Sequence, residues 1–309
     1  MKEKNSFENL GASAIGLSGV VLFSAKSVFA KMAFEYRADP ISVLYLRMLF
    51  SFPLILLIGF FYEKTQKTSA IDWKDIAKVA VISVLGYYIS ALFNFIGLTY
   101  IEASIERLVL FLYPTMVIFL SLLFLNKPIT RNQIFAISLS YLGLIVAFAD
   151  KLLVNNNAGF WFGVMLIMLS SFTYAIFLTV ADGLIKRVGS FRFSTVAILT
   201  MCICMIVHAM FAGKTQITGY NSHVIWYCVL MAVLSTVIPV YLFNYSMSRL
   251  GASNVSIISC LGPVCTLLLS AILLKETITV WQIIGTIRVM GGVLIVNLEK
   301  TTEGKQYKH

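Results

Sequence analysis

LFNFIGLTYIEASIERLVLFLYPT (residues 92–115) and LFNYSMSRLGASNVSIISCLGPV (residues 242–264) are two copies of one pattern, aligned with a single gap. The correspondence continues downstream at a shift of about 149 residues, which marks an internal repeat. The matched positions are Ala103-Ser104 with Ala252-Ser253, Pro114 with Pro263, Ile129-Thr130 with Ile278-Thr279, Gln133 with Gln282, and Gly143 with Gly292. The chain is therefore expected to be a duplicated unit.

The composition places that unit in a membrane. Of the 309 residues 59% are hydrophobic and only 12% are charged, and the mean hydropathy is +0.87. Soluble domains carry about 25% charged residues. The apolar residues also gather in stretches of about 20, the length of a helix that crosses a bilayer. Helices are predicted near residues 10–33, 41–62, 75–98, 103–125, 130–149, 159–181, 192–211, 223–247, 251–274 and 279–298.

Five helices per copy is an odd number, so the second copy must enter the membrane from the opposite side. That arrangement is an inverted repeat, which is common in secondary transporters. The predicted fold is an all-α membrane protein with ten transmembrane helices in two inverted five-helix repeats. The repeats are expected at residues 1–150 and 151–299, followed by a cytoplasmic tail at 300–309.

The net charge of +10 is interpreted as a signal of how the chain is oriented in the membrane. Lys and Arg residues lie in short connections, with no basic arm to bind nucleic acid. With the N-terminus inside, few basic residues fall outside, so the positive-inside rule predicts that both termini are cytoplasmic. The residues expected outside are Lys31, Arg37, Lys151, Lys214 and Lys275. The first helix has no small-residue cleavage site, and we expect a multi-pass protein of the inner (plasma) membrane.

Several of these residues also form a family pattern. The first copy reads Glu102-Ala103-Ser104, Pro114 and then Pro128-Ile129-Thr130; the second reads Gly251-Ala252-Ser253, Pro263 and then Lys275-Glu276-Thr277-Ile278-Thr279. This pattern resembles the EamA-type branch of the drug/metabolite transporter superfamily, although Asn126-Lys127 replaces the usual Gly-Glu in the first copy. The resemblance implies a ten-helix carrier of small metabolites. It also implies that the first, third and fourth helices of each half line a cavity while the fifth helices are peripheral.

Ionisable residues inside the predicted helices are costly and are therefore functional candidates. Four are basic, namely Lys26, Arg47, Arg107 and Arg288, and Glu106 is the acid. All but Arg288 are expected at a similar depth in the outer half of the membrane, with Glu106 paired to Lys26. The functional interpretation is a substrate-binding or proton-coupling cluster; the alternative is an ion-pair network that only holds helices together. Arg288 lies near the centre of the last predicted helix and has no assigned role.

Uncharged candidates fall on the same helices. Pro114 and Pro263 are candidate gating hinges, with static kinks as the alternative. The side chains expected to bind an organic solute, or else to serve packing, are Tyr88, Asn94, Tyr113, Tyr174, Tyr241 and Asn244. Asn94 and Asn244 correspond across the repeat. His208 and the five cysteines lack the spacing of a metal site and are expected to pack.

These observations predict a secondary transporter that moves a small organic metabolite, such as an amino acid or amine, by alternating access. The chain carries no ATP-binding motif, so a gradient is expected to drive transport, with a proton on Glu106 as the candidate coupling ion. No cofactor or metal is expected, and the partners are the solute and membrane lipid, in a monomer or homodimer. The alternatives are an uncoupled facilitator or exporter and an intramembrane enzyme, for which no catalytic motif is found.

Overall fold

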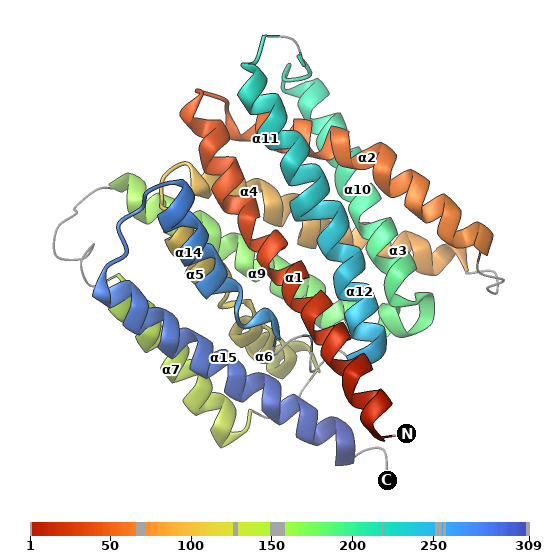
Figure 1. The fold of residues 1–309 in the computed structure, drawn as a ribbon, viewed down its shortest axis with the longest axis vertical. Coiled ribbons are helices and arrows are strands. Elements are labelled where there is room, and N and C mark those ends of the chain that lie inside the picture. The colour runs from red at the N-terminus through yellow and green to blue at the C-terminus, as the bar shows by residue number, and fades with distance from the viewer. Residues whose placement is uncertain are drawn as a thin grey trace.

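The computed structural model describes residues 2–65, 72–125, 129–148, 158–217, 219–250, 255 and 258–306. These residues form helices and short connections, without strands (Figure 1). In chain order the helices are α1 (Lys2–Glu35), α2 (Pro40–Thr65), α3 (Trp73–Ser83), η1 (Val84–Ile89), α4 (Ser90–Leu98), α5 (Ala103–Leu110), α6 (Tyr113–Leu125), α7 (Arg131–Ala147), α9 (Ala158–Val188), α10 (Ser190–Phe211), α11 (Ser222–Ala232), η2 (Val233–Val237), α12 (Ile238–Leu250), α14 (Gly262–Leu273) and α15 (Val280–Gln306).

Within the described residues, seven helical segments are long and apolar enough to cross a membrane. They are Gly11–Glu35, Pro40–Thr65, Trp73–Leu98, Ala103–Phe124, Ala158–Ala181, Ser190–Phe211 and Ser222–Ser246. Three shorter apolar helices, Arg131–Ala147, Gly262–Leu273 and Val280–Ile295, coincide with other predicted segments. The protein is therefore a multi-pass membrane protein.

Helix starts are capped at equivalent positions of the two halves. Asp72 accepts a hydrogen bond from the backbone N–H of Lys74 at 3.0 Å, and Asn221 accepts one from that of His223 at 3.0 Å. Thr130 and Gln133 form a capping box at the start of α7. Thr279 and Gln282 exchange the same two bonds at the start of α15, each at 3.2 Å.

Two of the predicted helices contain a π-helical turn. The turn η1 lies between α3 and α4, and η2 lies between α11 and α12. In each the backbone closes an i to i−5 bond, from Ser90 N–H to the Leu85 carbonyl and from Ile238 N–H to the Val233 carbonyl. The two turns begin at equivalent positions of the repeat. π turns inside helices are frequent at functional sites.

The helix predicted at 103–125 is not continuous. It breaks at Phe111 and Leu112, and Pro114 becomes the second residue of α6. Pro263 is likewise the second residue of α14, just after a turn at Cys260 and Leu261. A proline is tolerated at the start of a helix because the N–H it lacks would have no partner there. Both prolines thus follow breaks of the helix.

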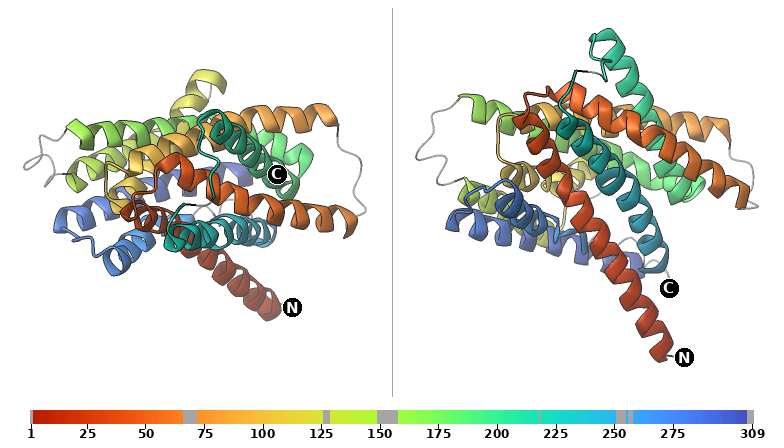
Figure 2. Two further views of the ribbon diagram at one scale, coloured as in Figure 1. Left: turned by 90° about the horizontal axis from the view of Figure 1, so that it is seen from above. Right: turned by 45° about the horizontal axis from the view of Figure 1, so that its top comes forward.

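Helix α1 packs against α11, α12 and α14, and α7 lies with α15 at one edge of the bundle (Figures 1 and 2). A Cβ added to Gly285 would lie 2.5 Å from the Ala147 Cβ, and one added to Gly292 would lie 2.5 Å from the Ala136 carbonyl oxygen. Residue numbers in contact therefore increase along α15 while they decrease along α7, so the two helices are antiparallel. Close approach through small residues is common between membrane helices.

The start of α1 and the end of α15 lie at the same end of the molecule (Figure 1). The helix of α15 continues to Gln306, into the segment expected as a tail. Some predicted features lie outside the described residues, namely the connection at 126–128, the repeat boundary at 150 and 151, and the turn at 251–253.

Candidate functional site

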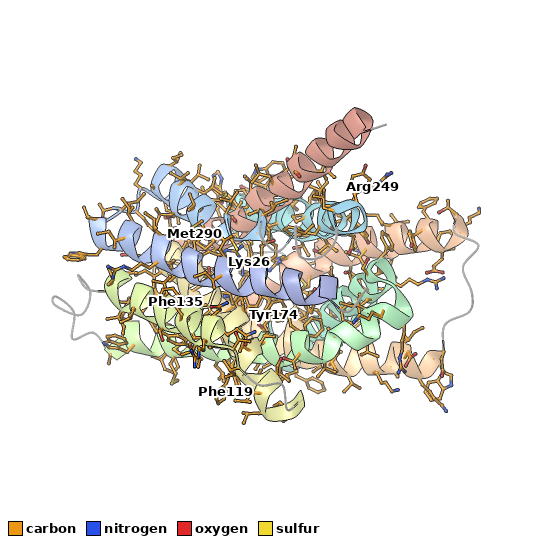
Figure 3. The ribbon with its side chains drawn as sticks, turned by 90° about the horizontal axis from the view of Figure 1, so that it is seen from below. Lys26, Phe119, Phe135, Tyr174, Arg249 and Met290 are labelled. Atoms are coloured by element: carbon orange, nitrogen blue, oxygen red, sulfur yellow. The ribbon has the colours of Figure 1, made fainter. Side chains whose placement is uncertain are left out.

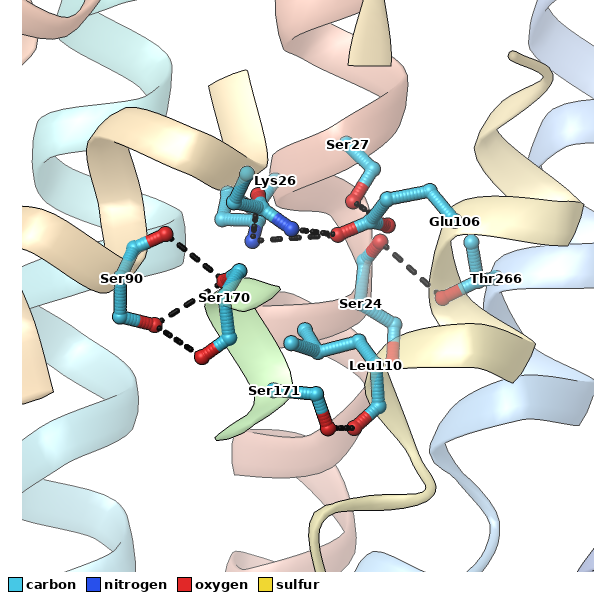
Figure 4. Close-up of polar contacts among 10 residues, drawn as sticks. Ser24, Lys26, Ser27, Ser90, Glu106, Leu110, Ser170, Ser171 and Thr266 are labelled. Atoms are coloured by element: carbon cyan, nitrogen blue, oxygen red, sulfur yellow. Dashed lines mark hydrogen bonds and ion pairs between the residues drawn. The ribbon is translucent and has the colours of Figure 1, made fainter. Parts of the chain in front are cut away.

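The centre of the candidate site is Glu106 on α5, whose side chain is fully buried. Its Oε2 accepts a hydrogen bond from the Ser27 hydroxyl at 2.6 Å. Its Oε1 accepts one from the Asn94 amide at 2.5 Å and lies 3.6 Å from the Lys26 Nζ. Figure 4 shows Lys26 and Ser27 reaching this carboxylate from the same helix. The expected pair of Lys26 and Glu106 is therefore present.

Asn94 on α4 connects the two charges. Its Oδ1 accepts a hydrogen bond from the Lys26 Nζ at 2.8 Å while its amide donates to Glu106. The network of Lys26, Ser27, Asn94 and Glu106, called here the Glu106 network, joins α1, α4 and α5. Lys26 lies toward the middle of the bundle, whereas Phe119 lies at its rim (Figure 3).

Arg47 on α2 lies beside this network without joining it. Its guanidinium carbon is 5.5 Å from the centre of the Phe95 ring, and the Lys26 Nζ is 6.0 Å from the same ring. Its Nε donates to the Thr236 hydroxyl of η2 at 2.9 Å, and that hydroxyl donates to the Met231 carbonyl. Arg47 is thus attached to the π turn of the second half.

Arg107 follows Glu106 in α5 but faces other neighbours. Its guanidinium carbon lies 5.0 Å from the centre of the Phe23 ring. A Cβ built on Gly262, the first residue of α14, would lie 2.6 Å from the Arg107 Nη2. Ser24 of α1 also contacts this part of α14, because its hydroxyl, which donates to the Val20 carbonyl at 2.7 Å, lies 3.2 Å from the Gly262 carbonyl oxygen. The Arg107 Nε is buried and has no hydrogen-bond partner among the residues described.

Tyr113 and Tyr174 belong to one aromatic group. Their rings meet edge to face with centroids 5.3 Å apart, and Tyr174 also contacts the Tyr87 ring at 6.3 Å. Phe177 stacks against Tyr174 at 5.9 Å. This group joins the start of α6 to η1 and α9.

The other predicted binding residues lie apart from this group and from the Glu106 network. The Tyr88 hydroxyl is 2.7 Å from the His208 Nδ1, which links η1 to α10. Tyr241 packs against Phe191 with centroids 4.8 Å apart. Asn244 is buried on α12, and in the described structure its Nδ2 has no hydrogen-bond partner.

Serine hydroxyls form hydrogen bonds between the helices near the Glu106 network. Ser90 and Ser170 each donate a hydroxyl to the carbonyl of the other, at 2.9 and 2.7 Å. Ser171 donates to the Leu110 carbonyl at 3.1 Å, which gives a partner to a group at the end of α5 (Figure 4). Sequence reasoning passed over Ser27 and these serines because it weighed charged and aromatic side chains.

Glu276 was also missed as a contact residue. Its carboxylate accepts hydrogen bonds from the backbone N–H of Ala103 at 2.9 Å and from the Ser104 hydroxyl at 2.9 Å. It therefore caps the N-terminus of α5, where a negative charge is favourable. The signal was present in the sequence, since Glu276 belongs to the connection motif of the second copy and the matching position of the first copy is Lys127.

Arg288 lies on the outer face of α15. Its side chain is exposed, and a Cβ added to Gly143 of α7 would lie 2.8 Å from the Arg288 Cβ. Arg288 is thus separate from the buried cluster, unlike Lys26, Arg47 and Arg107.

Comparison with known proteins shows the family to which the chain is similar. The model of the EamA-like transporter family matches residues 10–149 and again 161–298. An uncharacterized transporter of Bacillus subtilis (strain 168), YcbK, is 29% identical over 96% of this chain and 94% of its own length. An uncharacterized transporter of Archaeoglobus fulgidus is 25% identical over 84% of this chain and 88% of its own.

One solved crystal structure has a TM-score of 0.63 to this chain, covering 93% of it and 96% of the other protein, at 14% identity. That likeness shows a common fold. The family and the names of the relatives point to a transporter rather than an enzyme, with a small-molecule substrate and a lipid environment. Because the family model matches both halves and nearly the whole chain, the protein belongs to the EamA-like transporter family.

Proposed function

We propose that this protein is a secondary transporter of the inner membrane that moves a small organic metabolite by alternating access. Its ten transmembrane helices would form two inverted five-helix repeats, residues 1–150 and 151–299, with both termini in the cytoplasm. The antiparallel contact of α7 with α15 supports inversion, because these are the fifth helices of the two halves. Termini at one end of the molecule fit an even number of crossings.

The observation that carries the proposal is the Glu106 network. Ionisable side chains buried among membrane helices are costly and therefore mark functional candidates, and Glu106 is fully buried at the contact of three helices. Glu106 is on α5, which ends at the break before Pro114 and packs against α14, the helix that follows the equivalent break before Pro263. Discontinuous helices near the midplane are where carriers of this general kind bind solutes.

Within this proposal Glu106 carries the coupling proton, and Lys26 and Asn94 hold its charged form. Pro114 and Pro263 act as hinges, because the helix can bend at a break without losing further backbone bonds. Glu276 joins α5 to the second half at the end opposite the termini, so its bonds to Ala103 and Ser104 would form and break during the cycle.

The test uses proteoliposomes and works for a solute of any identity. Vesicles with and without the protein are placed in a bacterial metabolite extract under an imposed proton gradient, and mass spectrometry identifies any solute that accumulates. We expect accumulation that depends on the protein and collapses with the gradient. Exchange of an accumulated solute without a pH gradient, and no net accumulation with one, would instead favour the uncoupled facilitator. No solute movement at all would contradict transport.

A further inference from the structure

The buried charge around the Glu106 network is unbalanced. Among the described residues the buried side chains of Lys, Arg, Asp or Glu are Lys26, Arg47 and Arg107, at 7, 5 and 7% exposure, and Glu106, at 0%. These buried side chains therefore include three cations and one carboxylate. Burying a charge without a counter-charge is unfavourable, so a site of this kind gains from a ligand that brings negative charge.

Glu106 has little capacity left for a cationic solute. One oxygen accepts from Ser27, and the other accepts from Asn94 and lies against Lys26. An amine that entered would have to displace Lys26 and would meet the field of Arg47 and Arg107. The arrangement thus disfavours a positively charged solute.

Arg107 is the buried cation whose Nε has no hydrogen-bond partner among the described residues. Phe23 covers one face of its guanidinium, and the edge with Nε and Nη2 faces the start of α14 at Gly262. The Nε is buried and donates to no atom of the described chain. A guanidinium edge with two parallel N–H groups matches the two oxygens of a carboxylate or phosphate.

The start of α14 adds to this preference. The helix begins at Gly262, next to Arg107, and it is twelve residues long. The N-terminal end of a helix carries partial positive charge and free N–H groups, which favour anions. Gly262 has no side chain, which lets the guanidinium lie against this end of the helix, and a Cβ at that position would overlap the Nη2.

We propose that the transported solute is an organic oxyanion, bound by the Arg107 guanidinium beside the N-terminal end of α14. The inference rests on the proposed transport function and narrows its substrate class to molecules that present a carboxylate or a phosphate, which excludes amines without an acidic group. In this arrangement Lys26 pairs with Glu106 and does not bind the solute, while Arg107 is the specificity-determining residue.

The test compares four probes that share a phenyl ring, with the full chain in detergent. Benzoate and phenyl phosphate are anions, benzamide is neutral and benzylamine is a cation. A ligand that binds the folded state raises its melting temperature. We expect benzoate, phenyl phosphate or both to raise it, and the anion that does so identifies the oxyanion preferred. Benzamide and benzylamine are expected to have no effect.

Two variants test the place of binding. Arg107→Gln removes the charge, and Gly262→Ala keeps every charge but displaces the guanidinium. In each, the concentration of anion needed for half of the shift should rise at least tenfold. Arg249→Gln is the control, because Arg249 is exposed on α12 and lies over Tyr245. If Arg107→Gln does not fold, the anion response of Gly262→Ala alone tests the proposed place of binding.

The proposal is overturned if neither anion raises the melting temperature, if both variants respond as the wild type does, or if benzamide or benzylamine stabilises as well as the anions. These results would leave transport itself intact, since the metabolite-extract assay detects accumulation of a solute of any charge. If an amine accumulates in that assay and no anion raises the melting temperature, the transport function is supported and the oxyanion substrate class is rejected.

Discussion

Asn94 illustrates how a single residue determines the site. Its amide donates to Glu106 and its carbonyl oxygen accepts from Lys26, so it orients a carboxylate and an ammonium that belong to different helices. An amide can do this because it carries a donor and an acceptor on one planar group. The equivalent residue, Asn244, has no such pair of partners in the described structure. The repeat is thus symmetric in sequence here and asymmetric in bonding.

Asn94→Leu should destabilise the protein. The substitution removes both hydrogen bonds and leaves buried groups of Lys26 and Glu106 short of a partner, at a cost of about 1–3 kcal/mol for each stranded group. The matched control is Asn244→Leu, which removes an amide whose Nδ2 is unpartnered and should cost much less. Thermal unfolding in detergent measures both. Equal losses in the two variants would contradict the assigned bonds.

Asp39, before α2, predicts a pH dependence. It accepts from the Ser42 backbone N–H at 3.1 Å and from the Ser42 hydroxyl at 2.6 Å, and it pairs with Lys214 at 3.4 Å. Partial burial acts to raise the pKa of Asp39, but the bonds from Ser42 together with the charge of Lys214 outweigh it and hold the pKa below its usual range.

A lowered folded-state pKa contributes stability above the unfolded value, about 4, and that contribution is lost as the pH falls through the folded value. The difference in melting temperature between the wild type and Asp39→Asn should therefore be largest near pH 6 and shrink below about pH 4. Melting curves across this range measure it. A difference that stays constant with pH would show that ionisation of Asp39 is not involved.

At the scale of the element, the π turns are the features that set the site apart from plain helices. In η1 the widened turn brings Gly86 so close to Phe177 of α9 that a built Cβ would overlap the Phe177 side chain. In η2 it places Thr236 so that its hydroxyl reaches both Met231 and Arg47. A π turn exposes side chains and carbonyls that a regular helix would turn away.

Gly86→Ala should lower stability by about 1–3 kcal/mol, because overpacking forces η1 and α9 apart. Gly183 on α9 is the control, since a Cβ there meets nothing within 4 Å. Gly183→Ala should be neutral or stabilising by up to about 1 kcal/mol, as expected when glycine is replaced in a helix. Denaturant or thermal unfolding compares them. A neutral Gly86→Ala would contradict the packing of η1 on α9.

Sequence reasoning reached the apolar segments, because hydropathy marks them, and the pairing of Lys26 with Glu106, because the depth of each charge follows from its position along its helix. It placed Pro114 inside a continuous helix, whereas the chain breaks at Phe111 and Leu112, since hydropathy does not register which backbone bonds are made. The π turns were invisible for the same reason. The contact of Glu276 with α5 joins residues far apart in the chain and depends on the fold.

For the whole molecule, the claim with the widest consequence is that the two halves are inverted. Lys214 and Lys78 test it, since both side chains are largely exposed, at 46 and 60%. In a background without the native cysteines, a membrane-impermeant maleimide should label Lys214→Cys in intact cells and Lys78→Cys only after permeabilisation. The physical reason is that basic residues concentrate on the cytoplasmic side. Labelling of Lys78→Cys in intact cells would contradict the orientation.

The account as a whole depends on Glu106 as the group that couples the gradient to solute movement, and one comparison tests it most directly. Accumulation driven by a proton gradient is measured in proteoliposomes for the wild type, for Glu106→Gln and for Glu63→Gln. Glu63 is an exposed carboxylate paired with Arg192, so it matches the change in charge at a distance from the buried network. We predict that Glu63→Gln accumulates solute as the wild type does, while Glu106→Gln loses accumulation. Full accumulation by folded Glu106→Gln would contradict the central claim.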